Sequence, residues 1–150
     1  MTDWPVDLRG VTESVVTTRG PDGDWHVAAL GLQAPGRDGD EAQPDVVTAR
    51  TWGQTLTRTH FERRGRGVVQ FTRDPVVIVE AALTTTVVEE PVLPSADAWS
   101  EVTVSQVDSG TEGDTSWVDW RLEPTESGVE RRTIPTINRG FNAVIEAAVA

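Results

Sequence analysis

The sequence predicts a mainly β, or α+β, domain whose strands form a barrel-like sheet. Segments rich in β-branched and aromatic residues recur along the 150-residue chain, and clusters of Gly, Pro and Asp separate them. Only two or three segments show helix caps or helical periodicity. A chain of this length buries roughly 70% of its unfolded surface around one core, so we expect a single domain over residues 1–150.

The first third of the chain predicts a hairpin and a third strand. Residues 11–32 hold two β-branched and apolar stretches on either side of the turn sequence Gly20-Pro-Asp-Gly23, which is typical of a β-hairpin. Residues 34–45 combine Gly, Pro and Asp without apolar periodicity and predict a surface loop. Residues 46–52 then predict a strand that ends at Gly53.

The middle of the chain predicts two short helices around a strand. Residues 57–64 favour a helix with Thr57 or Thr59 as its cap and Gly65 as its stop. Residues 67–72 predict a strand. The pair Asp74-Pro75 then predicts a helix over residues 76–83, because a cap followed by proline is a specific signal and propensity is a weak one.

The last third predicts a second hairpin and a terminal helix. Residues 99–107 and 115–122 alternate in polarity on either side of the Gly- and Asp-rich stretch 108–114. Apolar residues recur at helical spacing over residues 136–150, which predicts an amphipathic helix. The expected total is six to seven strands with two or three helices, an α+β barrel.

Composition excludes several kinds of site. The chain has no cysteine, which excludes disulfides, thiolate metal sites and cysteine nucleophiles, and its two histidines leave little for a metal site, so we expect none. The first residues do not resemble a signal peptide and no apolar run reaches membrane-spanning length, so we expect a cytoplasmic protein without a membrane partner. The common nucleotide-binding, metalloprotease and hydrolase motifs are absent.

The charge of the chain is acidic and unevenly distributed. Thirteen arginines and no lysine stand against 24 acidic residues, for a formal net charge of -11. This balance opposes nucleic-acid binding, because phosphate would be repelled, and it favours a halophilic source, because carboxylates keep a protein hydrated in concentrated salt. Residues 50–73, named the basic segment below, instead hold six arginines and one acid, Glu62, for a local charge of +5.

The start of the basic segment suits a phosphate group. A strand-to-helix junction there brings together hydroxyls and guanidinium groups, namely those of Arg50, Thr51, Thr55, Thr57 and Arg58. Helix N-terminal amides, hydroxyl donors and arginine forks converge on one anion in many proteins. The alternative is that the arginines pair with surface carboxylates, which we expect for Arg63, Arg64 and Arg66 beyond the hydroxyl cluster.

The aromatic residues and histidines carry weaker signals. Three of the six tryptophans, Trp99, Trp117 and Trp120, lie on expected strands, where core packing is the default. Trp52 lies inside the basic segment, so it is the tryptophan that we consider for contact with a ligand. For both histidines, His26 and His60, we expect structural or surface roles.

Three stretches of the sequence resemble a known family. They read TESVVTTRG with WHVAALGL after it, RTWGQTLTRTHFERRGRGVVQFTRDP, and TINRGFNAVIEAAV. Together they are similar to the archaeal domain of unknown function 447 family, and haloarchaeal members look closest. Members of that family resemble flavin reductases, so the resemblance implies an FMN-binding split β-barrel, FMN as the cofactor and a homodimer.

The resemblance also implies the residues of a flavin site. Arg50, Thr55, Thr57 and Arg58 would hold the phosphate, the backbone of Val27, Ala28 and Ala29 and the amide of Gln70 would face the ring, and Asn138 and Arg139 would reach the pocket from the dimer partner. Two departures stand out. The asparagine and proline of the family's second segment are replaced, and Gln70 takes the place of the usual asparagine. Family members continue beyond residue 150, so the terminal helix is expected to be truncated relative to them.

The activity stays open at this level. The expected function is FMN binding in an uncharacterised role, with no catalytic residue assigned and an FMN-dependent oxidoreductase as one possibility. The alternatives are an NAD(P)H-dependent flavin reductase, and a barrel that has lost its cofactor and serves as a dimerisation module. A deazaflavin is a further alternative, because arginines and hydroxyls recognise a phosphate and not a ring.

Overall fold

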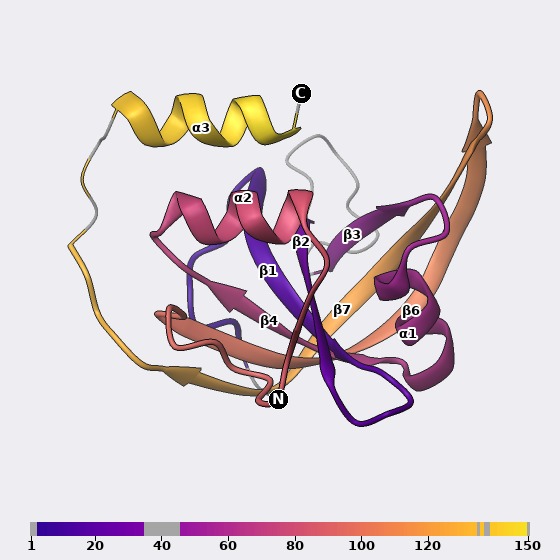
Figure 1. Cartoon of the computed structure of the whole chain (residues 1–150), viewed down its shortest axis with the longest axis horizontal. Helices are drawn as coiled ribbons and strands as arrows, with labels where there is room; N and C mark the ends of the chain where they lie inside the picture. The colour runs from indigo at the N-terminus through magenta and orange to yellow at the C-terminus, as the bar shows by residue number, and fades with distance from the viewer. Residues whose placement is uncertain (1–2, 35–45, 135, 137–138, 150) are drawn as a thin grey trace.

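Seven strands and three helices make up the described part of the chain. A computed structural model describes residues 3–34, 46–134, 136 and 139–149 (Figure 1). The elements are β1 (Val11–Arg19), β2 (Trp25–Gln33), β3 (Val47–Trp52), α1 (Leu56–Arg64), β4 (Arg66–Phe71), α2 (Pro75–Leu83), β5 (Thr86–Val88), β6 (Ala98–Glu112), β7 (Thr115–Val129) and α3 (Arg139–Val149). The predicted mainly β fold is confirmed.

Six strands close into an antiparallel barrel. They pair in the order β1, β4, β6, β7, β3, β2, and β2 pairs again with β1 to complete the ring. The hairpin β1–β2 is in continuous register from Val11 opposite Gln33 to Arg19 opposite Trp25. The short strand β5 adds to β2 outside the ring. The barrel predicted from the sequence is therefore the observed architecture.

The barrel interior is filled by apolar side chains from every part of the ring. Val16, Val69 and Val102 are fully buried there. Helix α1 contributes Phe61, whose ring packs edge-on against Trp120 with the ring centres 5.3 Å apart. This contact fixes α1 against the barrel and so sets the position of its first turn.

Helices α1 and α2 each begin at a side chain that caps the first helical turn. The Asp74 side chain accepts a hydrogen bond from the Val76 amide and Pro75 takes the first helical position, as predicted. The cap of α1 is Thr55, which accepts from the Arg58 amide, so the prediction of Thr57 or Thr59 is wrong by two residues or more. Thr55 has an extended backbone, which a cap requires, whereas Thr57 already lies in the first helical turn.

The second hairpin is longer than its polarity pattern suggests. Residues 108–112 and 123–129 were expected to turn or end the strands, but β6 and β7 each continue for 15 residues. Many of the residues in these two extensions are exposed, so their polarity pattern does not predict a strand. Backbone pairing between β6 and β7 extends the hairpin instead. Figure 1 shows this arm projecting from the barrel beside α1. Strand β5 was not predicted either.

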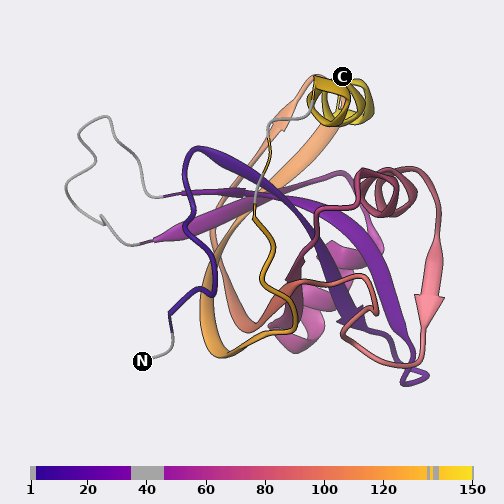
Figure 2. The same cartoon turned by 90° about the vertical axis from the view of Figure 1, so that its left-hand side faces the viewer.

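Helices α2 and α3 cover one side of the barrel. Ile78 and Ala81 of α2 pack on Val15 and Val27 of the first hairpin, and Ile145 of α3 lies against the same cluster. Figures 1 and 2 show α3 next to α2, on the side of α2 away from the barrel. The expected terminal helix is thus present from Arg139. None of the helices in the described ranges is long and apolar enough to cross a membrane.

Candidate functional site

A cavity of about 410 Å³ lies where the barrel meets two helices. One wall is β2 at residues 26–30, a second is the junction of β3 and α1 between residues 50 and 57, and a third is the end of α2 between residues 81 and 85. The first wall is mostly apolar, and the second carries hydroxyl and guanidinium groups. The cavity therefore has one wall that carries an arginine and hydroxyl groups and another that is mostly apolar, with Thr84 and Thr85 in the third.

Most of the residues chosen from the sequence line this cavity. Those in its walls are Val27, Ala28, Ala29, Arg50, Thr51, Trp52, Thr55 and Thr57. Three others, Arg58, Gln70 and Arg139, are outside the cavity lining. Asn138 lies outside the described residues. The structure thus brings together two segments that are far apart in the chain, β2 and the start of the basic segment.

Arg50 is held rigidly at the cavity by its neighbours on the adjacent strand. Its Nε and one terminal nitrogen donate to the two carboxylate oxygens of Asp119 at 2.7 and 3.0 Å. Its guanidinium group also lies over the ring of Trp117, 3.9 Å from the ring centre. The hydrogen bond to Asp119 raises the pKa of Arg50, so the cation is permanent. Two of the three guanidinium nitrogens are engaged by Asp119, so an anion in the cavity would meet the other terminal nitrogen of Arg50.

The first turn of α1 supplies the remaining polar groups. The amides that open an α-helix lack acceptors within the helix, and the helix end carries a partial positive charge. Thr57 is 4% exposed, and its Oγ1 has no hydrogen-bond partner among the described residues. The Thr51 hydroxyl is already used, because it accepts from the Trp120 ring nitrogen at 3.0 Å. Thr57 is therefore the buried hydroxyl in this wall that a ligand could satisfy.

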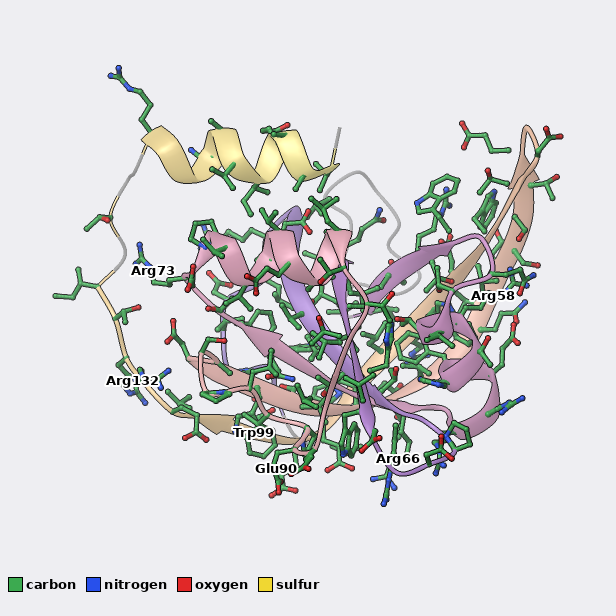
Figure 3. All side chains as sticks on the ribbon, in the orientation of Figure 1. Arg58, Arg66, Arg73, Glu90, Trp99 and Arg132 are labelled. Atoms are coloured by element: carbon green, nitrogen blue, oxygen red, sulfur yellow. The ribbon has the colours of Figure 1, made fainter. Side chains whose placement is uncertain are left out.

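Arg58 points away from the cavity. Its Nε donates to Glu62 at 3.0 Å and one terminal nitrogen donates to the Ser116 hydroxyl at 2.9 Å. Figure 3 shows Arg58 beside α1 and the ribbon of β6 and β7. Arg58 therefore joins α1 to β7 through Ser116. Arg50, and not Arg58, lines the cavity.

Gln70 lies in the barrel wall and not in the cavity. Its side chain is 1% exposed, and Nε2 donates to the Thr17 hydroxyl at 3.1 Å and to the Pro91 carbonyl at 2.6 Å. Its Oε1 accepts from the Leu93 amide at 2.7 Å. The amide therefore joins β4 to β1 and to the segment that follows β5.

Sequence reasoning missed the third wall and the partner of Arg50. Ala81, Ala82, Thr84 and Thr85 line the cavity from the end of α2, yet nothing in their local sequence marks a site. Asp119 was one acidic residue among many. Of the three strand tryptophans, Trp120 is buried in the core as expected, whereas Trp99 and Trp117 are only half-buried. Trp117 is used to hold Arg50 instead.

The two histidines form a small cluster beside the cavity. His60 is buried and shares a hydrogen bond of 2.8 Å between its Nδ1 and the Thr18 hydroxyl. The ring of His26, which lines the cavity, lies edge-on to it with the centres 6.0 Å apart. Burial lowers the pKa of both histidines, and the neighbouring His26, Arg64 and Arg63 lower that of His60 further. The lowered pKa values favour the neutral form of both rings at pH 7.

The lowered pKa of His60 makes stability depend on pH. In the unfolded chain the ring binds a proton near its ordinary pKa of about 6.5, and in the folded chain it binds one only at lower pH. The free energy of unfolding is therefore retained above pH 6.5 and falls as the pH drops below it. We expect urea denaturation at pH 7.5 and 5.5 to show this loss. The loss should be smaller in His60→Gln, and an equal loss in both proteins would contradict the assignment.

No metal site accompanies the cavity. Within the residues that the structure describes, no group of three or more histidine and acidic side chains could hold a metal ion.

Solved structures place this barrel in a fold class. An FMN-bound protein from Methanosarcina mazei superimposes with a TM-score of 0.73 at 21% identity, over 95% of this chain and 74% of that one. Nitrilotriacetate monooxygenase component B from Bacillus cereus gives 0.55 at 15% identity, over 81% and 71%. An FMN-binding protein from Thermus thermophilus, solved with 1-cyclohex-2-enone, gives 0.51 at 15%, over 87% and 82%. The chain has the flavin-reductase-like split-barrel fold.

Within that fold class the family is defined by the sequence. Residues 12–131 match the model described as the N-terminal domain of a protein of unknown function, DUF447. The chain belongs to this family, which confirms the family resemblance. The first two of the three stretches lie within the matched residues, and the third, from residue 136, lies beyond them. A search of curated proteins finds no match.

Proposed function

We propose that the chain is an FMN-binding flavoprotein and that the flavin occupies the cavity between β2, α1 and α2. The observation that carries the proposal is the division of the cavity into a cationic, hydroxyl-bearing end and a mostly apolar remainder. Its volume of about 410 Å³ falls in the range of small-molecule and cofactor sites. The FMN-bound relative from the same family supports the choice of FMN.

The polar end fits a phosphate monoester. Arg50 would place its oriented guanidinium group against the phosphate, and the open amides of the first turn of α1 would add donors. The unpartnered Oγ1 of Thr57 would gain an acceptor there. Leaving such a group buried and unpaired costs about 1–3 kcal/mol, so a ligand that satisfies it gains affinity. Thr55 stands at the same helix start as its cap.

The apolar part fits a flat ring system. Small side chains, among them Ala28, Ala29 and Ala82, line this part and leave room beside the strand. The backbone of Val27, Ala28 and Ala29 would face the ring edge, and Trp52 would stand at the cavity rim. When bound, the flavin supplies the redox chemistry, and the residues of the chain bind and orient it.

The proposal includes a homodimer. Trp52 and Leu56 line the cavity and are 46% and 48% exposed, and a second copy of the chain would cover them. Asn138 and Arg139 would then complete the pocket from the partner, as the family resemblance implies. FMN and a second copy of the chain are the proposed partners, and we propose no nucleic-acid or membrane partner. Residues 1–150 form one domain in this proposal, and the protein belongs to the cytoplasm of a halophilic archaeon. The acidic composition supports this setting.

Titration with FMN tests the proposal. We expect saturable quenching of tryptophan fluorescence together with a shift of the flavin spectrum. Arg50→Ala should weaken binding by roughly tenfold or more, as expected for loss of a charged hydrogen bond. Arg9→Ala is a matched control, because it also removes one arginine but lies outside the cavity, paired with Asp7.

The outcomes separate the candidate functions. Absence of saturable binding would reject the flavoprotein and favour the cofactor-free dimerisation module. Equal binding by the protein and Arg50→Ala would reject the cavity as the phosphate site. Arg58→Ala tests the family-based assignment, and we expect it to weaken FMN binding less than Arg50→Ala does, because Arg58 points to Glu62 and Ser116. Consumption of NADH or NADPH with FMN would identify a reductase.

A further inference from the structure

A second cavity of about 480 Å³ lies at the other end of α1. It is formed by the ends of β1 and α1 and the starts of β2 and β4. It shares no lining residue with the flavin cavity. Trp25 lines the second cavity and His26 the first, which is expected because consecutive residues of a strand point to opposite faces. The nine residues of α1, about 13 Å of helix, separate the two.

The second cavity is basic although the chain is strongly acidic. Three arginines from three elements line it, Arg19, Arg64 and Arg66, against one acid, Glu101. Arg66 pairs with Glu101, as expected for a surface arginine, and Figure 3 shows Arg66 extending from the edge of the barrel. The remaining two arginines give the lining a surplus of positive charge in a chain whose formal net charge is -11.

These two arginines are not neutralised by the protein. Among the described residues, the Arg64 side chain donates only to a backbone carbonyl, that of Gly20, at 3.2 Å. The Arg19 side chain has no hydrogen-bond or ion-pair partner in the described ranges. Acidic side chains are near in sequence, at Asp22 and Asp24 in the turn between β1 and β2, yet neither pairs with Arg19 or Arg64. Both guanidinium groups are therefore available to an anion in this cavity.

We propose that this cavity binds a phosphate-bearing ligand with a di- or triphosphate group. Guanidinium forks bind phosphate through paired charge-assisted hydrogen bonds, and two forks suit two neighbouring phosphates. The half-buried indole of Trp25 in the same wall offers a flat face on which a nucleobase stacks. A small ligand is favoured over a nucleic-acid polymer, because a polymer would also meet the acidic remainder of the surface. The site goes beyond the proposed flavin binding and does not depend on it.

Calorimetric titration with pyrophosphate and with ADP tests the proposal. The full chain is titrated first without FMN and then with FMN at saturation, each time in about 0.1 M and about 1 M salt. Charges are screened over about 10 Å at the lower salt concentration and over about 3 Å at the higher one. We expect saturable binding that weakens at the higher salt. The double variant Arg19→Ala/Arg64→Ala should lower the affinity at least tenfold and leave the Kd for FMN within about twofold. Arg9→Ala is again the matched control.

Trp25→Leu separates the two sources of the phosphate chain. If a nucleotide is the ligand, the variant weakens ADP binding and leaves pyrophosphate binding unchanged. If ADP binds no more tightly than pyrophosphate and the variant has no effect, the cavity takes an inorganic polyphosphate. The proposal is overturned if neither probe binds, if the double variant binds as well as the unaltered chain, or if both probes compete with FMN. If the protein does not bind FMN, the titrations without FMN still test this second site.

Discussion

Replacing Phe61 with alanine is expected to lower the free energy of unfolding by about 3–5 kcal/mol, the usual cost of removing a buried aromatic ring. Phe61 is 2% exposed and packs edge-on against Trp120. Its ring also lies directly over Gly67, where an added Cβ would come within 3.2 Å of it. The neighbouring backbone cannot collapse into the space that alanine leaves, because it belongs to the paired strand β4. Urea denaturation of both proteins measures the difference.

A matched variant on the same helix controls this experiment. Leu56 is 48% exposed, so Leu56→Ala should cost only about 1 kcal/mol, since nearly half of its surface is already in water. Phe61→Ala should also weaken FMN binding, because Phe61 fixes the helix whose first turn forms the polar end of the cavity. A cost below that of Leu56→Ala would show that α1 is not anchored through Phe61.

Replacing Gln70 with leucine is expected to cost about 1–3 kcal/mol of stability and to leave FMN affinity within about twofold. The change is close in volume, but it removes every hydrogen bond of the amide. The Leu93 amide then loses its acceptor, whereas the Pro91 carbonyl keeps the Thr17 hydroxyl as a donor, and one buried group left unpaired costs about 1–3 kcal/mol. The cavity is unaffected, because Gln70 is not in its walls. Denaturation and FMN titration of one preparation measure both quantities.

The opposite result would restore the family-based assignment. If Gln70→Leu folds with unchanged stability and loses FMN binding, the amide acts on the flavin and not on the segment that follows β5. Gln70→Asn adds a second measurement, because it keeps the amide but shortens it by one methylene. We expect Gln70→Asn to be destabilised, since the shorter side chain cannot reach both Pro91 and Leu93 as Gln70 does.

The cavity wall at the junction of β3 and α1 could be predicted because its residues are local in the chain. Arg50, Thr55 and Thr57 lie within one strand-to-helix junction, and the caps and stops of that junction are visible in the sequence. The direction of Gln70 could not be predicted. Its neighbours Val69 and Phe71 are buried too, so the alternation that normally tells one face of a strand from the other is missing.

The parts of the site made by tertiary contacts had no local signal. The end of α2 reaches the cavity because Ile78 and Ala81 pack on the first hairpin, a contact between distant segments. Asp119 meets Arg50 through the register of β3 against β7, which no single stretch of sequence encodes. The length of the β6–β7 hairpin was missed for a related reason: backbone pairing extends both strands although most of the added side chains are exposed.

The closed ring has a consequence for the order in which the protein folds. Hairpins β1–β2 and β6–β7 join neighbours in the chain, but β3 must pair with β7 across nearly half of the sequence, with Ala49 opposite Trp120. Closing so long a loop costs entropy before any contact repays it, and barrels dominated by such pairings fold in roughly milliseconds to seconds. Arg50 receives Asp119 and Trp117 from this same pairing. Arg50 is thus oriented only once this long-range strand pairing has formed.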